Sequence, residues 1–371
     1  MNVLVTGGAG FIGSHTTDAL LAAGHQVRVL DNLSPTVHRP GDPPRIPKGA
    51  EFIHGDVTNA ADVRRALDGV DAIYHLAAYQ DYLLDFSTFF HVNTVGTALL
   101  YETIVAGKLP IRRVLVASSQ AVYAEGKYRC AEHGTKYPAM RELEDLERGR
   151  WDLRCPDCGL VMTPEATDES VVNPQNQYAL SKYTQELIAL NLGRRWQIPT
   201  VAFRYSIVQG PRQSFRNAYS GACRVFCLSY YLGRQPVIYE DGGQLRDFVN
   251  IEDVVRANLL LLEHPEAPGQ VFNVGGGKAC TVLEFATIVA RATGSEPPRP
   301  GPALFRFGDT RHILSDVSRL TRLGWQPQCS PEKSVNDYLR WLKEQDGVDD
   351  IVTEAMKRMR SEGVVRDVVT T

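Results

Sequence analysis

The sequence of 371 residues has few features of a secreted, a membrane or a nucleic-acid-binding protein. It has seven cysteines, an odd number in a long chain, which disfavours a disulfide framework and favours the reducing cytoplasm. No apolar run approaches the roughly 20 residues of a membrane span. The net charge is only -3, and no basic block suggests nucleic acid as a partner. The first residues, MNVLVTGG, enter a strand directly, so no signal peptide is expected.

Short apolar runs of strand type recur along the first 210 residues, and helical patterns lie between most of them. This alternation predicts a parallel sheet covered on both faces, an α/β fold of the doubly wound kind. The predicted strands are 2–6, 26–32, 50–57, 71–78, 112–119 and 199–210, and the clearest helical patterns are 60–68, 93–107 and 178–194.

Two segments interrupt or follow this alternation. Residues 124–172 are polar and rich in Gly, Pro, Cys and charge, with no clear strand, and we interpret them as an insertion in a domain of residues 1–210. Residues 211–345 have an irregular pattern, with short strands at PVIYE and QVFNVGG. They predict a smaller, mainly substrate-binding lobe over the carboxyl ends of the strands, where open α/β folds bind ligands.

Residues 346–371 form a tail with one predicted helix at 349–363, which Gly363 would end. Its apolar residues share one side, which favours a stripe packed on the core over a partner surface. These residues are Ile351, Ala355, Met356 and Met359.

The stretch TGGAGFIG at 6–13 lies between a strand and a helix. Gly7 permits a tight turn, Gly10 lets the backbone approach a pyrophosphate, and Gly13 allows close helix–strand packing. The helix N-terminus would supply N–H groups to the phosphates. Asp31 ends the second strand, where a carboxylate accepts from a ribose 2′-OH and repels a 2′-phosphate. The sequence therefore predicts a Rossmann-type site for NAD rather than NADP.

The stretch YALSK places Tyr178 and Lys182 on one helix face. A tyrosine with an ordinary pKa near 10 is a poor base at neutral pH, and a nearby cation lowers that pKa. The pair is therefore a candidate acid–base that moves a hydroxyl proton during hydride transfer. Ser119, at the end of the fifth predicted strand, is placed to bridge the phenol and a substrate hydroxyl.

The chain resembles the extended short-chain dehydrogenase/reductase family, and within it the nucleotide-sugar epimerases, from residue 2 to about 343 outside the insertion. The resemblance rests on TGGAGFIG, DNL, GDV, HLAA, NTVGT, SSQAVY, YALSK, GPRQ and RDFVNIEDV. It implies that Ser119, Tyr178 and Lys182 are the catalytic residues.

The resemblance also implies binding residues. Those expected against NAD are Gly7, Gly10, Phe11, Ile12, Gly13, Asp31, Asn32, Asp56, Val57, Leu76, Ala77, Ala78, Asn93, Ser118, Tyr178, Lys182 and Tyr205. Those expected against a nucleotide sugar are Gln80, Ser119, Gln120, Ser206, Arg212, Arg246 and Arg306. Arg246 and Arg306 resemble the arginines that clamp the diphosphate, with a surface ion pair as the alternative for either.

The residues after Ser119 point to the reaction. Family members that eliminate water or carbon dioxide carry acidic residues there, whereas this chain has Gln120 and Ala121. The expected reaction is therefore epimerisation at C4 through a transient 4-keto sugar. Alternatives are an NAD(P)H-dependent 4-ketoreductase and, more remotely, a non-enzymatic NAD-sensing regulator.

The insertion carries four residues of metal-ligand type in a C-x2-H-x21-C-x2-C pattern, and a glycine follows each pair. This pattern predicts a structural tetrahedral zinc site, with an ordinary loop with free thiols, or a site that has lost its metal, as the alternatives. The four residues are Cys130, His133, Cys155 and Cys158.

The expected substrate is a dTDP-6-deoxyhexose such as dTDP-L-rhamnose, with a UDP-hexose as the alternative. The resemblance implies this, because a similar Cys-rich insertion occurs in bacterial proteins that resemble epimerases of dTDP-L-rhamnose. The stretch at 77–86 is also aromatic and apolar, as suits a sugar without a C6 hydroxyl. The resemblance also implies a homodimer through the helices near 93–107 and 178–194, with coverage by the sheet as the alternative. Their apolar residues include Leu99, Leu100, Ile104, Leu187, Ile188 and Leu190.

Overall fold

The computed structural model describes residues 1–38, 44–81, 84–215, 221–300, 304–348 and 350–369. Tyr82 and Leu83 of the predicted aromatic stretch, and Asp349 of the predicted tail helix, lie outside the described residues. Among the helices that are described, none has the length and apolar character needed to cross a bilayer.

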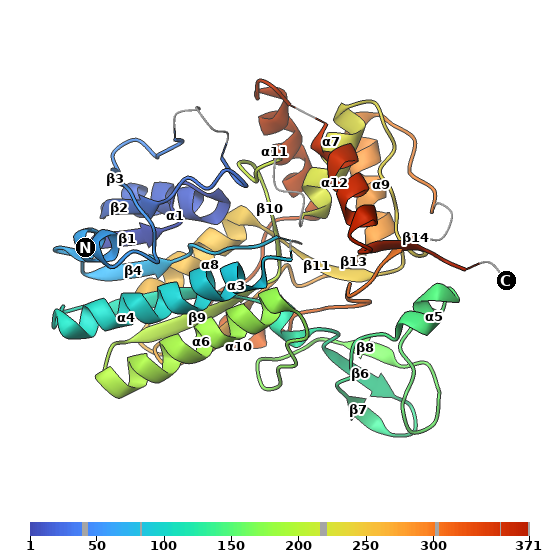
Figure 1. The fold of residues 1–371 in the computed structure, drawn as a ribbon, viewed down its shortest axis with the longest axis horizontal. Coiled ribbons are helices and arrows are strands. Elements are labelled where there is room, and N and C mark those ends of the chain that lie inside the picture. Colours follow the sequence, from blue (N-terminus) through green and yellow to red (C-terminus); the bar gives the residue numbers. More distant parts are fainter. Residues whose placement is uncertain (39–43, 82–83, 216–220, 301–303, 349, 370–371) are drawn as a thin grey trace.

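A seven-stranded parallel sheet forms the centre of the protein, as the sequence predicts (Figure 1). The strand order is β12-β9-β5-β4-β1-β2-β3. The chain winds outward from β1 in one direction and then returns to β4 on its other side, so that the carboxyl ends of β1 and β4 flank a topological switch point. The bounds are β1 Asn2–Thr6, β2 Gln26–Asp31, β3 Glu51–His54, β4 Ala72–His75, β5 Arg113–Ser119, β9 Thr200–Tyr205 and β12 Val271–Val274.

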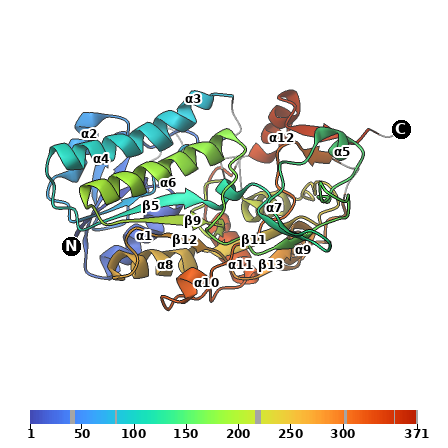
Figure 2. The ribbon, with the colours of Figure 1, turned by 90° about the horizontal axis from the view of Figure 1, so that it is seen from below.

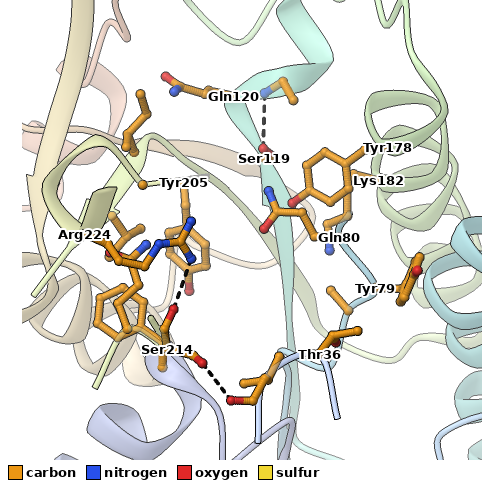
Figure 3. A pocket seen from close by; sticks show the side chains of 18 of the residues that line it. Thr36, Tyr79, Gln80, Ser119, Gln120, Tyr178, Lys182, Tyr205, Ser214 and Arg224 are labelled. Atoms are coloured by element: carbon orange, nitrogen blue, oxygen red, sulfur yellow. Dashed lines mark hydrogen bonds between the residues drawn. The ribbon is translucent and has the colours of Figure 1, made fainter. Parts of the chain in front are cut away.

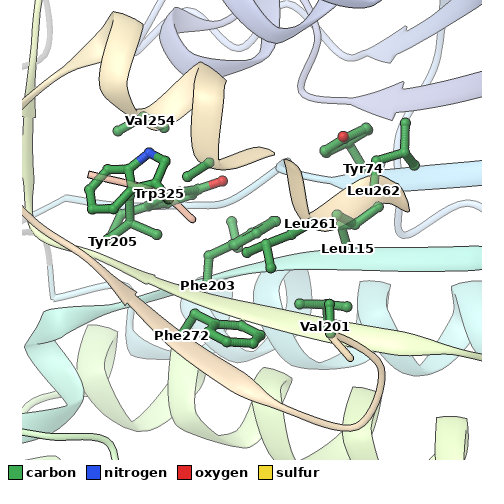
Figure 4. Close-up of a cluster of buried hydrophobic side chains, with 14 of the residues drawn as sticks. Tyr74, Leu115, Val201, Phe203, Tyr205, Val254, Leu261, Leu262, Phe272 and Trp325 are labelled. Atoms are coloured by element: carbon green, nitrogen blue, oxygen red, sulfur yellow. The ribbon is translucent and has the colours of Figure 1, made fainter. Parts of the chain in front are cut away.

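Helices cover both faces of this sheet (Figure 2). One face packs against α1 (Phe11–Ala22) and α8 (Ile251–Glu263), in a buried cluster that includes Phe203, Phe272 and Trp325 (Figure 4). The other face packs against α2 (Ala60–Leu67), the short α3 (Phe86–Phe89), the π-helical turn η1 (Phe90–Val95), α4 (Gly96–Ala106) and α6 (Gln177–Trp196). Because strands buried on both faces must be apolar throughout, their sequences read as continuous apolar runs.

The run 199–210 does not form the single strand that the sequence suggested. It divides into β9 in the central sheet and β10 (Ile207–Gln209), which pairs with β11 (Leu245–Asn250) in a small sheet completed by β13 (Ala279–Thr281). The break falls at Ser206, whose hydroxyl bonds Asp247 Oδ2 at 2.9 Å. An apolar run does not show where a chain passes from one sheet to another.

The second half of the chain supplies both the central sheet and a separate lobe. QVFNVGG forms β12, the edge of the central sheet, whereas PVIYE forms no strand, so its prediction as one is wrong. The lobe packs α7 (Ala222–Tyr231), α9 (Val282–Thr293) and α11 (Pro331–Lys343) around one core. Beside it lie α12 (Ile351–Ser361) and the antiparallel pair β14 (Leu304–Arg306) and β15 (Val365–Asp367). The short α10 (Ser318–Thr321) instead packs against β12 of the central sheet.

The insertion is a small folded unit, and the expectation that it lacks strands is wrong. The antiparallel strands β6 (Lys127–Cys130), β7 (Gly134–Lys136) and β8 (Thr163–Glu165) form its sheet, and the 3-10 turn η2 (Gln120–Tyr123) leads into it. A short helix, α5 (Leu143–Glu147), lies between β7 and β8 in the chain. Strands of three or four polar residues are too short to show an alternating pattern in the sequence.

A buried ion pair joins α6 to the sheet. Arg204 of β9 donates through Nε and Nη2 to the two carboxylate oxygens of Glu186 at 3.0 and 2.6 Å, and both side chains are buried. Arg204 Nη1 also donates to the Tyr123 hydroxyl at 2.8 Å and to the Glu169 carbonyl at 3.1 Å. This guanidinium therefore connects the sheet, α6 and both ends of the insertion.

We predict that Glu186→Ala lowers the free energy of unfolding by about 3–5 kcal/mol, because it leaves a buried guanidinium without its counter-charge. The matched control is Glu51→Ala, which breaks the exposed 2.8 Å pair with Arg28 and should cost at most about 1 kcal/mol. Urea denaturation followed by circular dichroism measures both. Equal losses in the two variants would contradict the special role of the buried pair.

Candidate active site

A cavity of about 1090 Å³ lies between the carboxyl edge of the central sheet and the C-terminal lobe. Its wall combines the glycine turn before α1, the ends of β2, β4, β5 and β9, the start of α6 and residues of the lobe. Insertion residues contribute as well, among them Glu125 and Met140. Parts of the chain more than 300 residues apart in sequence thus face one space.

The glycine turn has the tight geometry that its sequence predicts. Gly7 has a φ of +69°, and a Cβ there would lie 2.8 Å from the Ala77 backbone. A Cβ at Gly13 would lie 2.1 Å from the Gly7 carbonyl oxygen. No side chain caps the start of α1 at Gly10, so the first N–H groups of the helix remain available to an anionic ligand. This cradle fits the pyrophosphate of a dinucleotide.

Asp31 lies at the cavity wall beside this turn and is largely buried. Its carboxylate accepts from the backbone N–H of Ala9 at 3.0 Å and of Leu33 at 2.9 Å. Asn32 lines the cavity next to it. Asp56 does not line the cavity, because its carboxylate is turned toward Thr58 and the Asn32 amide, at 2.8 Å. Its role in the structure is to orient Asn32.

Ser119, Tyr178 and Lys182 are brought together at the cavity wall (Figure 3). Ser119 ends β5, and its hydroxyl is hydrogen-bonded to the Tyr178 phenol. Tyr178 and Lys182 lie one turn apart on α6, where Lys182 Nζ donates to Gln185 Oε1. The start of α6 is fixed by Asn176, whose side chain caps the helix by accepting from the Ala179 N–H at 2.8 Å.

Burial controls the electrostatics of this group. It raises the pKa of Tyr178 to about 12, and the hydrogen bond with Ser119 only partly opposes this. Burial also lowers the pKa of Lys182 to about 7, although the nearby Glu186 carboxylate acts to raise it. The expectation that Lys182 lowers the Tyr178 pKa is therefore wrong, because desolvation of the phenol dominates. Desolvation disfavours both charges, so the phenol stays protonated at neutral pH.

Arg246 and Arg306 line the lobe side of the cavity. Arg246 donates to the carbonyl oxygens of Thr310 at 2.6 Å and Arg311 at 3.0 Å, and approaches Asp309 Oδ1 at 3.4 Å. The Arg306 guanidinium lies 5.7 Å from the centre of the Tyr239 ring, and burial lowers its pKa. Neither is a fully exposed surface ion pair.

Most of the other expected binding residues line the cavity, and two more do not. Asn93 is buried behind the wall, where its amide bonds the Tyr79 backbone N–H at 2.8 Å and the Ser181 hydroxyl at 2.9 Å. Arg212 pairs with Asp18 at 2.6 Å, away from the cavity. Those that line it are Phe11, Ile12, Val57, Leu76, Ala77, Ala78, Gln80, Ser118, Gln120, Tyr205 and Ser206.

The position of the insertion predicts that it covers or borders the sugar pocket, but two sets of wall residues were not named as such from the sequence. Glu125 and Met140 belong to the insertion, and burial raises the pKa of the Glu125 carboxyl to about 7, although Arg141 opposes this. The apolar side of α12, interpreted from the sequence as a core-packing stripe, faces the cavity through Met356 and Met359. The insertion begins just after Ser119, and this position indicated that its residues lie near the cavity. For α12, the indication was its apolar stripe.

The four Cys and His residues of the insertion lie together, with their candidate ligand atoms within 4.8 Å of one another. Cys130 Sγ lies 3.6 Å from Cys158 Sγ and 3.7 Å from His133 Nδ1, and Cys155 Sγ lies 3.7 Å from the same nitrogen. The glycines after the two pairs, Gly134 and Gly159, have φ values of +66° and +73°, as tight turns require.

Comparison with known proteins agrees with this geometry. A relative from Burkholderia thailandensis, dTDP-L-rhamnose 4-epimerase, is 34% identical over 350 residues, covering 92% of this chain and 95% of its own length. UDP-glucose 4-epimerase from Mycolicibacterium smegmatis is 33% identical over 358 residues, covering 92% and 99%. The crystal structure of UDP-glucose 4-epimerase from Thermotoga maritima with UDP-glucose has a TM-score of 0.75 at 27% identity, covering 93% and 99%.

A family model covers most of the chain. The model for the NAD dependent epimerase/dehydratase family matches residues 3–142 and 157–275, and so omits only a short part of the insertion within that range. The match includes the glycine turn, Ser119, Tyr178 and Lys182. The chain therefore belongs to the NAD dependent epimerase/dehydratase family of enzymes.

Proposed function

We propose that this enzyme is a nucleotide-sugar 4-epimerase that keeps its NAD bound. The observation that carries the proposal is the hydrogen-bonded Ser119–Tyr178 pair, placed with Lys182 in the same cavity as the glycine turn. Single-ligand pockets usually measure about 300–1,000 Å³, so the volume of about 1090 Å³ suits two ligands together.

The glycine turn and Asp31 would hold NAD, which would supply the hydride acceptor, and then the hydride donor, for C4 of the sugar. Tyr178 takes the proton of the 4-hydroxyl in the first step and gives it back in the second. Ser119 hydrogen-bonds the phenol and orients the hydroxyl. Lys182, when charged, stabilises the phenolate. Between the two steps the 4-keto sugar rotates in the cavity to present its other face, while Arg246 and Arg306 hold its diphosphate.

The wall next to Ser119 favours epimerisation over elimination. Gln120 and Ala121 line the cavity and neither is a general acid or base at neutral pH. Elimination of water needs such a group beside Tyr178. Asp31 favours NAD over NADP, because its carboxylate would repel a 2′-phosphate at the same position.

For the substrate we propose a dTDP-6-deoxyhexose such as dTDP-L-rhamnose. Support comes from the relative in Burkholderia thailandensis that carries that name and from apolar side chains in the cavity wall, including Leu84, Phe86 and Met140. A UDP-hexose is the second candidate, because relatives and structural neighbours of similar identity are UDP-glucose 4-epimerases.

We propose that the Cys/His cluster of the insertion binds one structural zinc ion. Tetrahedral zinc with sulfur ligands at about 2.3 Å and nitrogen ligands at about 2.0–2.1 Å separates neighbouring ligand atoms by about 3.6–3.8 Å. The separations of 3.6 and 3.7 Å between the Cys and His ligand atoms fit that geometry. The four side chains complete the coordination shell, so the ion stabilises the insertion and takes no part in catalysis.

We also propose a homodimer through α4 and α6, which lie side by side on the outer face of the sheet (Figure 2). Leu100 and Ile104 are buried in the core and so are used within the chain. Leu187 is exposed, however, and so is Leu180, seven residues earlier on the same helix, together with Val95. This apolar surface, on α6 and at the last residue of η1 beside the start of α4, suits a four-helix contact between two copies.

The first test is turnover by Tyr178→Phe. We expect a loss of at least about a hundredfold, the usual scale for a positioned acid–base group, with NAD still bound. Assays with dTDP-L-rhamnose and UDP-glucose on the unmodified enzyme establish the sugar, and product analysis by NMR shows whether C4 inverts. Tyr183→Phe, on the same helix, is the control. Near-normal activity of Tyr178→Phe would contradict the proposed mechanism.

The second test is the metal content. We expect about one zinc per chain by elemental analysis, and loss of this zinc in the Cys155→Ser/Cys158→Ser variant. The Cys280→Ser/Cys329→Ser variant, altered outside the cluster, should retain the metal. Substrate KM should rise in the first variant, because its insertion loosens, while NAD content persists. Wild-type protein purified without chelator that holds below about a tenth of an equivalent would refute the zinc site.

The third test is the mass in solution. Light scattering at micromolar concentration should give twice the chain mass of 41.2 kDa. Leu180→Glu/Leu187→Glu should give the single-chain mass, because it buries like charges across the contact. The control Leu160→Glu changes an exposed leucine of the insertion and should remain dimeric. A wild-type monomer would exclude the dimer.

A further inference from the structure

The C-terminal helix α12 presents its apolar side to the cavity. Five of its residues line that space, and the neighbouring Val364 lines it too. Met359 is buried, whereas Met356 is only partly covered and its sulfur accepts from the Tyr239 hydroxyl at 3.7 Å. The five residues are Ile351, Val352, Ala355, Met356 and Met359. Ile351 and Val352 also pack on the core of the lobe, but the rest of this apolar face is turned toward the cavity, which indicates that a ligand covers it there.

Both ends of α12 are fastened to other parts of the protein. At its start, Arg234 of the lobe pairs with Asp350 and donates to the Thr353 hydroxyl at 2.7 Å. Beyond its end, β15 pairs with β14, and the backbone N–H of Val369 donates to the Glu147 carbonyl of the insertion at 2.9 Å. The helix is therefore held as a wall between the lobe and the insertion.

The charges of α12 also reach the opposite side of the cavity. Arg358 of α12 interacts electrostatically with Asp81 and Tyr79, which lie on the loop after β4. That loop belongs to the half of the protein that carries the glycine turn, and Tyr79 lines the cavity. The helix thus spans the space between the lobe and the NAD-binding half.

The order of side chains along the cavity identifies the part of the ligand that α12 meets. The reacting sugar lies at Tyr178, and its diphosphate requires the cations Arg246 and Arg306. Tyr239 comes next, since its ring lies 5.7 Å from the Arg306 guanidinium and its hydroxyl contacts Met356. Beyond the diphosphate of a nucleotide sugar is the nucleoside, whose base is flat with apolar faces.

We infer that α12 is the wall that receives the nucleobase of the nucleotide sugar, with Met356 against the base. Polarisable thioethers beside an aromatic ring suit a flat heterocycle and adapt to its shape. The inference rests on the proposed function, because that function places the sugar at Tyr178. It makes the C-terminal tail a substrate-binding element and Met356 a determinant of base affinity.

Calorimetry on the full-length enzyme with bound NAD tests this inference, with dTDP and UDP as the probes. Met356→Gln replaces the thioether with an amide of similar length, and the dissociation constant of the preferred probe should rise about tenfold, as expected when one apolar contact is lost. The control Lys357→Gln changes the neighbouring residue, which pairs with Glu354 and does not line the cavity, and should bind normally. NAD content should be unchanged in both.

Hydrogen exchange provides the second measurement. If α12 had only a structural role, its exchange rates would not change when the nucleotide is added. Amides of residues 351–361 should exchange more slowly when dTDP is added to the NAD-bound enzyme. An unchanged dissociation constant in Met356→Gln, or unchanged exchange in α12, would overturn the inference and leave the proposed function intact. A wild-type enzyme that binds neither dTDP nor UDP would overturn the proposed function itself.

Discussion

The arrangement of the site depends on the ion pair and hydrogen bonds made by the buried guanidinium of Arg204. A charge taken out of water must be fully paired, and this one meets the Glu186 carboxylate, the Tyr123 phenol and the Glu169 carbonyl. Glu186 lies on α6, one turn beyond Lys182, so the pair fixes how α6 sits on the sheet. Tyr123 precedes the insertion and Glu169 lies near its end. One desolvated charge therefore sets the position of Tyr178 and closes the base of the insertion.

The same exclusion of water shapes the chemistry of the cavity. Burial raises the pKa of Tyr178 to about 12 and lowers that of Lys182 to about 7, so burial favours the neutral form of both groups. Perturbed values of this kind are typical of functional sites. For the proposed reaction, the phenol is then a ready proton donor to a ketone. It becomes a base only when a charge, on Lys182 or on a bound ligand, stabilises the phenolate.

Ion pairs join the insertion to the lobe, and a ring contact between Trp151 and Phe305 accompanies them. Arg141 of the insertion donates to Glu240 at 2.8 Å. Arg311, which is also paired with Asp241 of its own lobe at 2.7 Å, donates to Asp152 of the insertion at 2.9 Å. Arg311 belongs to the segment 306–313, and Arg141 also donates to the carbonyl oxygen of Asp309 in that segment at 2.7 Å. The same segment carries the cavity residues Arg306 and Asp309, so a shift of the insertion would be felt at that end of the cavity. In this way the proposed zinc site would affect substrate binding without supplying a catalytic group.

Features that are encoded in one short stretch of chain could be predicted before the fold was known. The apolar runs of β1 to β5, the glycine turn at 6–13, the one-turn spacing of Tyr178 and Lys182, and the four Cys and His residues could all be identified from local pattern. The residues and strands that those stretches contact could be identified only from the fold. In the fold, β12 pairs with β9 in the central sheet, Arg212 pairs with Asp18 across 194 positions, and α12 lines the cavity. The fold also reversed the expected pKa of Tyr178, because local spacing shows which charges are near but desolvation depends on everything packed around them.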